Sequence, residues 1–126
     1  MVSRVIVVED NELVRDVVVA HLRRAGHRTR EAGSAEDALR LVAGDAPPDI
    51  AVLDVGLPTM DGLTLLGALR RRLDDPAFPA VFLSAKVEQP DIDAGRRLGC
   101  VYLTKPFVGS ALLSAIERSL PQPDTW

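Results

Sequence analysis

The feature that most constrains the fold is an alternation, repeated five times, of short strand-like runs with longer stretches of helical periodicity. This alternation is typical of a parallel sheet with helices on both of its faces. Three of the runs are entirely or almost entirely apolar, as in strands that are buried on both sides. The expected strands are Arg4–Val8, Arg28–Glu31, Ile50–Leu53, Ala80–Ser84 and Val101–Leu103. Because the second run is polar, we expect it at an edge of the sheet.

Helix boundaries are marked by capping residues, glycines and prolines. The first helix is expected to bury a stripe that ends before Gly26, namely Val14, Val17, Val18, Leu22 and Ala25. Ser34 precedes Asp37 in an arrangement typical of a capped second helix. Pro76 and Pro121 stop the third and last helices, and a shorter, more charged helix is expected between Pro90 and Leu98.

Length and charge limit the organisation and the partners. A chain of 126 residues that is 47% hydrophobic can bury a core of its own. We expect one domain over residues 1–120, with residues 121–126 as a tail or the beginning of a linker. The net charge of −3 argues against direct binding of nucleic acid. The start of the chain has too short an apolar run for a membrane span or a signal peptide, so we expect a cytoplasmic protein.

Charged residues follow three of the apolar runs, and they are the candidate site. They are Glu9 and Asp10, then Asp54, then Lys105 with Pro106 after it. In open parallel sheets, functional groups gather at the carboxyl ends of the strands, so these side chains should converge. Three carboxylates and one ammonium suit Mg²⁺ and an anionic phosphoryl group.

Each of these residues also has an ordinary structural interpretation. Asp54 can accept a phosphoryl group as a covalent nucleophile, but an isolated aspartate at a strand end often only caps a turn. Glu9 and Asp10 can bind a cation or simply place negative charge near a helix N-terminus. Lys105 can neutralise phosphoryl oxygens, and the proline after it raises the chance of a cis peptide bond. Ser84 can donate a hydroxyl hydrogen bond, although alone it indicates nothing.

Five fragments in order along the chain resemble the receiver domain of bacterial two-component response regulators. They are Val8-Glu9-Asp10-Asn11, Leu53-Asp54-Val55-Gly56-Leu57-Pro58, Met60-Asp61-Gly62, Leu83-Ser84-Ala85 and Tyr102-Leu103-Thr104-Lys105-Pro106-Phe107. Each fragment alone is weak evidence for the resemblance, but the ordered set is specific and covers residues 3–120. The resemblance implies an α/β fold of the flavodoxin-like (βα)5 type, with a parallel five-stranded sheet of order 2-1-3-4-5.

The resemblance also implies a role for each site residue. Asp54 would be the phosphoacceptor, and it would bind Mg²⁺ (or Mn²⁺ in its place) together with Asp10, the Gly56 carbonyl and, through water, Glu9. Ser84 and Lys105 would contact the phosphoryl oxygens. Tyr102 would turn inward when Ser84 moves toward the phosphate. The implied partners are a histidine kinase or histidine phosphotransfer protein and an output partner or effector domain that the sequence does not identify.

Rival functions are distinguished by single residues. The domain would be a phosphoacceptor with phosphoryl-transfer and slow self-dephosphorylation chemistry, without turnover of a metabolite. A phosphatase of the haloacid dehalogenase type would want a second aspartate two residues after Asp54, where Gly56 stands. A phosphate-independent interaction module with a receiver fold is the alternative, although such modules typically lose part of the acidic set. A nucleotide or flavin domain would want a glycine-rich loop after the first strand, where this chain has acids.

Overall fold

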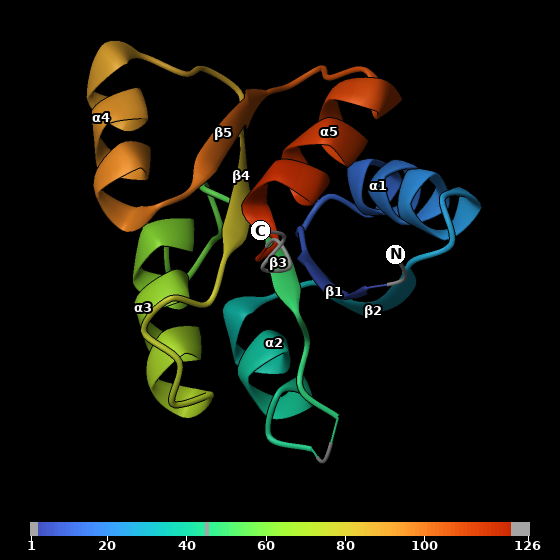
Figure 1. Ribbon diagram of the computed structural model, residues 1–126, viewed down its shortest axis with the longest axis vertical. Helices are drawn as coiled ribbons and strands as arrows, with labels where there is room; N and C mark the ends of the chain where they lie inside the picture. The colour runs from blue at the N-terminus through green and yellow to red at the C-terminus, as the bar shows by residue number, and fades with distance from the viewer. Residues whose placement is uncertain (1–2, 45, 122–126) are drawn as a thin grey trace, which may run out of the picture.

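The computed structural model of the chain describes residues 3–44 and 46–121. Strands and helices alternate along the whole of this region (Figure 1). The strands are β1 (Arg4–Val8), β2 (Arg28–Ala32), β3 (Ile50–Asp54), β4 (Ala80–Ser84) and β5 (Val101–Thr104). The helices are α1 (Glu12–Arg24), α2 (Ala35–Leu41), α3 (Gly62–Arg72), α4 (Gln89–Leu98) and α5 (Gly109–Ser119). Most of the expected tail, residues 122–126, lies outside the described residues.

All five strands belong to one parallel sheet of order β2-β1-β3-β4-β5. The predicted flavodoxin-like order is therefore confirmed. The polar strand β2 lies at an edge, as expected, and only its last residue is buried. The central strand β3 is buried at every position, because helices cover both faces of the sheet around it.

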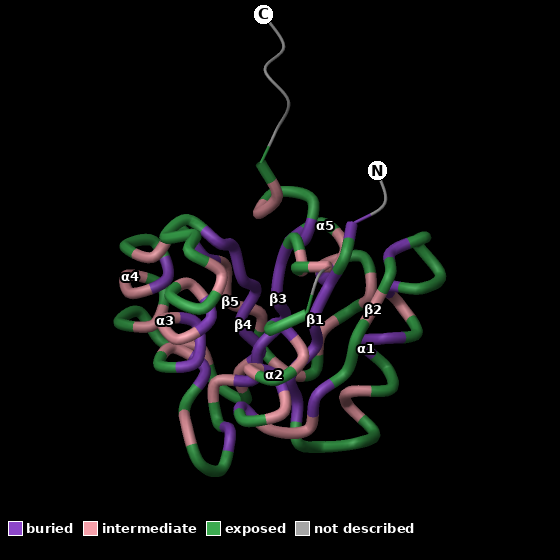
Figure 2. The backbone as a smooth tube through the Cα atoms, turned by 90° about the horizontal axis from the view of Figure 1, so that it is seen from below, coloured by how far each residue is buried: buried purple, intermediate pink, exposed green. Residues whose placement is uncertain are grey.

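Side chains that alternate along the strands divide the core into two layers. One face of the sheet packs against α2 and α3, with Ile6, Leu53 and Phe82 among its buried residues. The other face packs against α1 and α5, with Val7, Val52 and Leu83 buried. Figure 2 shows β1, β3 and β4 as mostly buried segments in the middle of the molecule, whereas the edge strands β2 and β5 are mostly not buried. The side-chain period of two along a strand is the reason that neighbouring residues enter different layers.

The buried stripe of α1 differs from the predicted one. Val18 and Leu22 are buried as expected, but Val17 is 50% exposed and Val19 is buried in its place. Ala25 lies beyond the last helical residue and is exposed. Three consecutive valines, at positions 17, 18 and 19, make the rotation of the helix ambiguous from periodicity alone.

Several helix ends confirm local signals in the sequence. The Ser34 hydroxyl accepts a hydrogen bond from the Asp37 N–H, and the side chains of Asn11 and Asp61 cap α1 and α3 in the same way. The peptide bond between Lys105 and Pro106 is cis. None of the helices in the described residues combines the length and the apolar character that a bilayer span requires.

Candidate functional site

The carboxyl ends of β1, β3 and β5 bring three predicted site residues together. Glu9 follows β1, Asp54 is the last residue of β3, and Lys105 follows β5. The Lys105 Nζ donates hydrogen bonds to both carboxylate oxygens of Glu9, at 3.1 and 3.2 Å. The same ammonium lies 3.4 Å from Asp54 Oδ1. Residues 9, 54 and 105 thus form one charged cluster, as the spacing of the apolar runs predicted.

Asp10 completes a set of oxygen ligands that fits a small divalent cation. One carboxylate oxygen from each of Glu9, Asp10 and Asp54 lies within 4.8 Å of the others. Glu9 and Asp54 are buried, whereas Asp10 is exposed, so the cluster has an open side. Hard oxygen donors with no sulfur or imidazole suit Mg²⁺ or Mn²⁺ rather than zinc. The site residues therefore fit the metal that the sequence predicted.

Burial of Glu9 changes its acidity. The pKa of Glu9 is raised from 4.5 to about 7, mainly by loss of hydration and also by the neighbouring Asp54. The hydrogen bonds from Lys105 act in the opposite direction and lower the pKa. Because one ammonium faces several carboxylates, the cluster retains excess negative charge that a cation would neutralise.

Asp54 is held by the backbone around it. The N–H of Gly56 donates to Asp54 Oδ1 at 3.0 Å, which is a turn that the short side chain of aspartate can make. Further along the loop, the Gly62 N–H donates to the Val55 carbonyl. A Cβ at Gly62 would lie 2.8 Å from the Asp54 carbonyl oxygen, so α3 approaches the acceptor strand more closely than a larger residue would allow.

Two residues support the site without having been predicted to do so. Arg15 Nη1, on α1, donates to the backbone carbonyl of Glu9 at 2.8 Å, and its Nε lies 3.7 Å from a Glu31 carboxylate oxygen. This guanidinium connects the acidic loop to α1 and to the edge strand. The sequence signal for Gly62 was its place in the Met60-Asp61-Gly62 fragment, whereas nothing in the sequence distinguished Arg15 from other arginines of a solvated helix face.

Ser84 lies at the predicted strand end but its hydroxyl does not point into the cluster. The hydroxyl donates to the carbonyl of Lys86 at 2.8 Å. In the described part of the chain, no hydrogen bond connects it to Asp54 or Lys105. The backbone nevertheless links these elements, because the Lys105 N–H donates to the Ser84 carbonyl at 2.7 Å.

Tyr102 lies against the sheet and α4. Its ring centroid is 4.9 Å from that of Phe82, and a Cβ at Gly95 would lie 2.8 Å from its Cε1 atom. The phenol oxygen is buried and has no hydrogen-bond partner among the described residues. This burial is the main cause that raises the pKa of Tyr102 above 10.0. The aromatic ring is therefore in contact with α4, and its hydroxyl is withdrawn from solvent.

Comparison with known proteins agrees with this geometry. Residues 5–117 match the family model of the response regulator receiver domain. The regulatory protein SphR of Synechococcus elongatus, named for alkaline phosphatase synthesis, is 35% identical over 96% of this chain and 51% of its own length. CseB of Streptomyces coelicolor, a transcriptional regulatory protein, is 34% identical over 94% of this chain and 49% of its own. The chain spans about half the length of these relatives.

Solved structures resemble the whole described fold. The chemotaxis protein CheY4 of Vibrio cholerae superposes with a TM-score of 0.85 at 26% identity, over 95% of this chain and all of that one. NtrX of Brucella abortus gives a TM-score of 0.84 at 32% identity, over 95% of this chain and 27% of its own. The family match, the sheet order and the acidic cluster agree, and the chain belongs to the response regulator receiver domain family.

Proposed function

We propose that the chain is a phosphorylation-activated switch in which Asp54 accepts a phosphoryl group from a histidine kinase or histidine phosphotransfer protein. The observation that carries this proposal is the position of the Lys105 ammonium, which lies between Glu9 and Asp54 at the carboxyl edge of the sheet. A capping aspartate would need no such arrangement. The family membership of the chain supports the same function.

Transfer would make one bond and break one. An Asp54 carboxylate oxygen attacks the phosphorus atom, and the bond from phosphorus to the donor breaks, so that an acyl phosphate forms and the donor leaves with the electron pair. Glu9, Asp10 and Asp54 would hold Mg²⁺ or Mn²⁺, with the Gly56 carbonyl as a further ligand. When bound, the metal supplies positive charge that offsets charge on the phosphoryl oxygens. The Lys105 ammonium offers a second positive charge to the same oxygens.

Hydrolysis of the acyl phosphate would return the domain to its resting state. Asp10 is exposed, so water has access to the open side of the cluster. Slow self-dephosphorylation is the expected result, without turnover of a metabolite.

The output would follow from a change at the end of β4. The Ser84 hydroxyl, which donates to the Lys86 carbonyl, would turn to donate to a phosphoryl oxygen and release that carbonyl. The hydrogen bond from the Lys105 N–H to the Ser84 carbonyl keeps the ends of β4 and β5 together during this change. Tyr102, whose phenol oxygen is already buried, would then be held in this inward position. A shift between two such populations is sufficient to change the surface near α4.

The receiver unit of the proposal comprises residues 1–120, and its output would act through a partner or an effector domain. The curated relatives are named as transcriptional regulatory proteins and are about twice as long as this chain. Regulation of transcription is therefore the process we propose for the protein to which this domain contributes.

The test is phosphorylation by acetyl phosphate, read by intact-mass measurement. The wild-type chain should gain one phosphoryl group in the presence of Mg²⁺ and none after chelation of the metal. Asp54→Ala should remove the gain. Asp16→Ala is the matched control, because Asp16 is an exposed aspartate of α1, and it should be labelled like the wild type.

Two outcomes would overturn the assignment. Labelling of Asp54→Ala at the wild-type level would show that another residue accepts the phosphoryl group. Failure of the wild-type chain to gain mass with Mg²⁺ and excess acetyl phosphate would favour a phosphate-independent interaction module with the same fold.

A further inference from the structure

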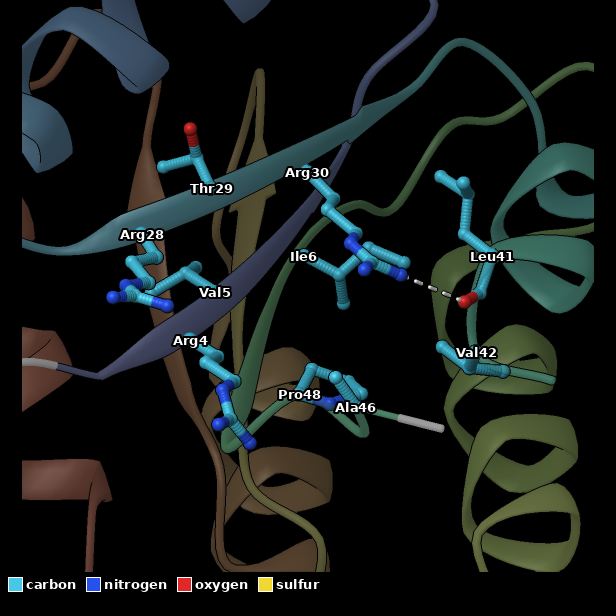
Figure 3. Close-up of a pocket in the computed structure, with 10 residues that line it drawn as sticks. All are labelled: Arg4, Val5, Ile6, Arg28, Thr29, Arg30, Leu41, Val42, Ala46 and Pro48. Atoms are coloured by element: carbon cyan, nitrogen blue, oxygen red, sulfur yellow. Dashed lines mark hydrogen bonds between the residues drawn. The ribbon is translucent and has the colours of Figure 1, made fainter. Parts of the chain in front are cut away.

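A pocket of about 260 Å³ opens at the amino-terminal ends of β1 and β2, on the face of the sheet that α2 covers (Figure 3). Three arginines come from the strands: Arg4 from the beginning of β1, and Arg28 and Arg30 from β2. The opposite wall is apolar and is formed by Leu41 and Val42 at the end of α2 and by Ala46 and Pro48 before β3. Figure 3 shows the Arg30 side chain reaching toward Leu41 across the opening.

Strand geometry explains why basic side chains gather on this face. Arg4 pairs in register with Arg28, and Ile6 pairs with Arg30, so the three arginines alternate to the same side as the buried Ile6. Thr29, which lies between Arg28 and Arg30 on β2, points to the other face, where its hydroxyl accepts a hydrogen bond from Arg23.

The acidic side chains near this region already have partners, on the other face of the sheet or at the edge of the pocket. Glu31 forms ion pairs with Arg15 and Arg23 of α1, on the opposite face of the sheet. Asp49, before β3, accepts a hydrogen bond from the backbone N–H of Arg4. Among the residues that the structure describes, the lining of the pocket contains no carboxylate. Within a chain of net charge −3, three guanidinium groups therefore share one opening whose described lining residues carry no carboxylate.

We propose that this pocket binds a nucleotide, with its phosphates on the arginines and its base against the apolar wall. Guanidinium groups form paired hydrogen bonds with phosphate oxygens and also stack on planar rings. A nucleoside diphosphate carries about three negative charges at neutral pH, which matches the three arginines. The volume lies just under the range of about 300–1,000 Å³ for drug-sized ligands, so a base fits inside while the phosphates remain at the opening.

This pocket is separate from the acidic cluster. Arg4 is the first residue of β1, a strand of five residues, and Glu9 follows its last residue. At a rise of about 3.3 Å per residue, the two ends are roughly 15 Å apart. Because the acidic cluster repels phosphates when no metal is present, nucleotide binding in the absence of Mg²⁺ would not arise from the acidic cluster.

The experiment is a titration of the full chain with ADP in EDTA, followed by calorimetry and by ¹⁵N–¹H spectra. Adenosine and pyrophosphate are titrated separately, so that the contributions of the base and of the phosphates to the affinity can be distinguished. We expect ADP to bind more tightly than either part and to shift the amide signals of residues 4–6, 28–30, 41–44 and 46. The variant Arg28→Gln/Arg30→Gln should weaken ADP binding at least about tenfold. The substitution removes hydrogen bonds from charged guanidinium groups to the phosphates, and such bonds are stronger than those between neutral groups.

A matched control removes the same charge elsewhere. Arg96 and Arg97 are exposed on α4, far along the sheet from the pocket, and Arg96→Gln/Arg97→Gln should bind ADP like the wild type. Melting temperatures of both double variants verify that they are folded. The proposal is wrong if ADP does not bind at millimolar concentration, if both double variants weaken binding equally, or if the shifted amides lie only at other sites. Binding of adenosine as tight as that of ADP would also refute it, because the arginines would then have no role.

Discussion

Replacing Gly95 by alanine is expected to destabilise the domain, although alanine is the better helix former. Gly95 lies inside α4, and its neighbours leave no room for a Cβ. That atom would lie 2.8 and 2.9 Å from two carbons of the Tyr102 ring and 2.9 Å from the Cys100 carbonyl oxygen. Only Gly99 and Cys100 separate α4 from β5, and the Cys100 N–H donates to the Gly95 carbonyl at 2.7 Å. The tight connection therefore prevents the backbone from moving away.

The net effect is a difference between two opposing contributions. Alanine in a helix interior stabilises by about 0.8–1 kcal/mol relative to glycine. Overpacking costs about 1–3 kcal/mol, and displacement of the ring from Phe82 would lose an aromatic contact that contributes about 0.5–1.5 kcal/mol. We expect Gly95→Ala to lower the free energy of unfolding by about 1–2 kcal/mol. For a domain of this size that corresponds to a melting temperature lower by roughly 4–8 °C.

Gly67→Ala is the matched control, because Gly67 also lies in a helix but has space around it. The nearest atom to its added Cβ is Arg71 Nη1, the end of a flexible side chain, at 3.6 Å. This variant should gain about 0.5–1 kcal/mol from helix propensity. Urea denaturation followed by circular dichroism gives both free energies. In the Tyr102→Ala background, Gly95→Ala should cost less than it does alone, since the ring is no longer there to collide. Equal gains in stability from Gly95→Ala and Gly67→Ala would show that the Tyr102 ring does not pack closely enough on Gly95 to exclude a Cβ.

Three further predictions concern the charged cluster and the switch. Mg²⁺ should raise the melting temperature of the wild type, while Asp10→Asn should raise the metal-free melting temperature and reduce the Mg²⁺ effect. Without metal, stability should fall as the pH rises from about 4.5 to about 7, because folded Glu9 holds its proton to a higher pH than unfolded Glu9. Glu9→Gln should flatten this part of the profile, measured by urea denaturation at each pH. Beryllofluoride with Mg²⁺ should change the ¹⁹F resonance of fluorotyrosine-labelled Tyr102 by increasing the population of its buried position, and Ser84→Ala should reduce the change.

Each of these predictions has a contradicting result. An unchanged Mg²⁺ response in Asp10→Asn would exclude Asp10 as a ligand. The titration of Glu9 is not the source of the pH dependence if Glu9→Gln keeps the wild-type slope between pH 4.5 and 7. A Tyr102 resonance that is indifferent to bound beryllofluoride would show that the signal leaves the domain by another surface. Tyr102 is the only tyrosine of the chain, so the assignment of that resonance is unambiguous.

Local sequence patterns determined the elements and the edge at which the site forms. Hydrophobic runs, capping residues and prolines placed all five strands and all five helices within the described residues, because these signals act over a few neighbouring positions. The convergence of Glu9, Asp54 and Lys105 followed from the same reasoning, since every parallel strand directs its carboxyl end to one edge. The sheet order itself came from the family resemblance.

Tertiary structure decided what depends on the rotation and contacts of single side chains. The periodicity of α1 did not distinguish Val17 from Val19, because adjacent valines satisfy either rotation until α5 and the sheet are packed against the helix. The direction of the Ser84 hydroxyl depends on a carbonyl two residues away, and the burial of Tyr102 depends on the absence of a side chain at Gly95. The gathering of three arginines beside α2 likewise required the register of β1 against β2, which no local pattern encodes. Such contacts join residues far apart in the sequence, so only the folded chain determines them.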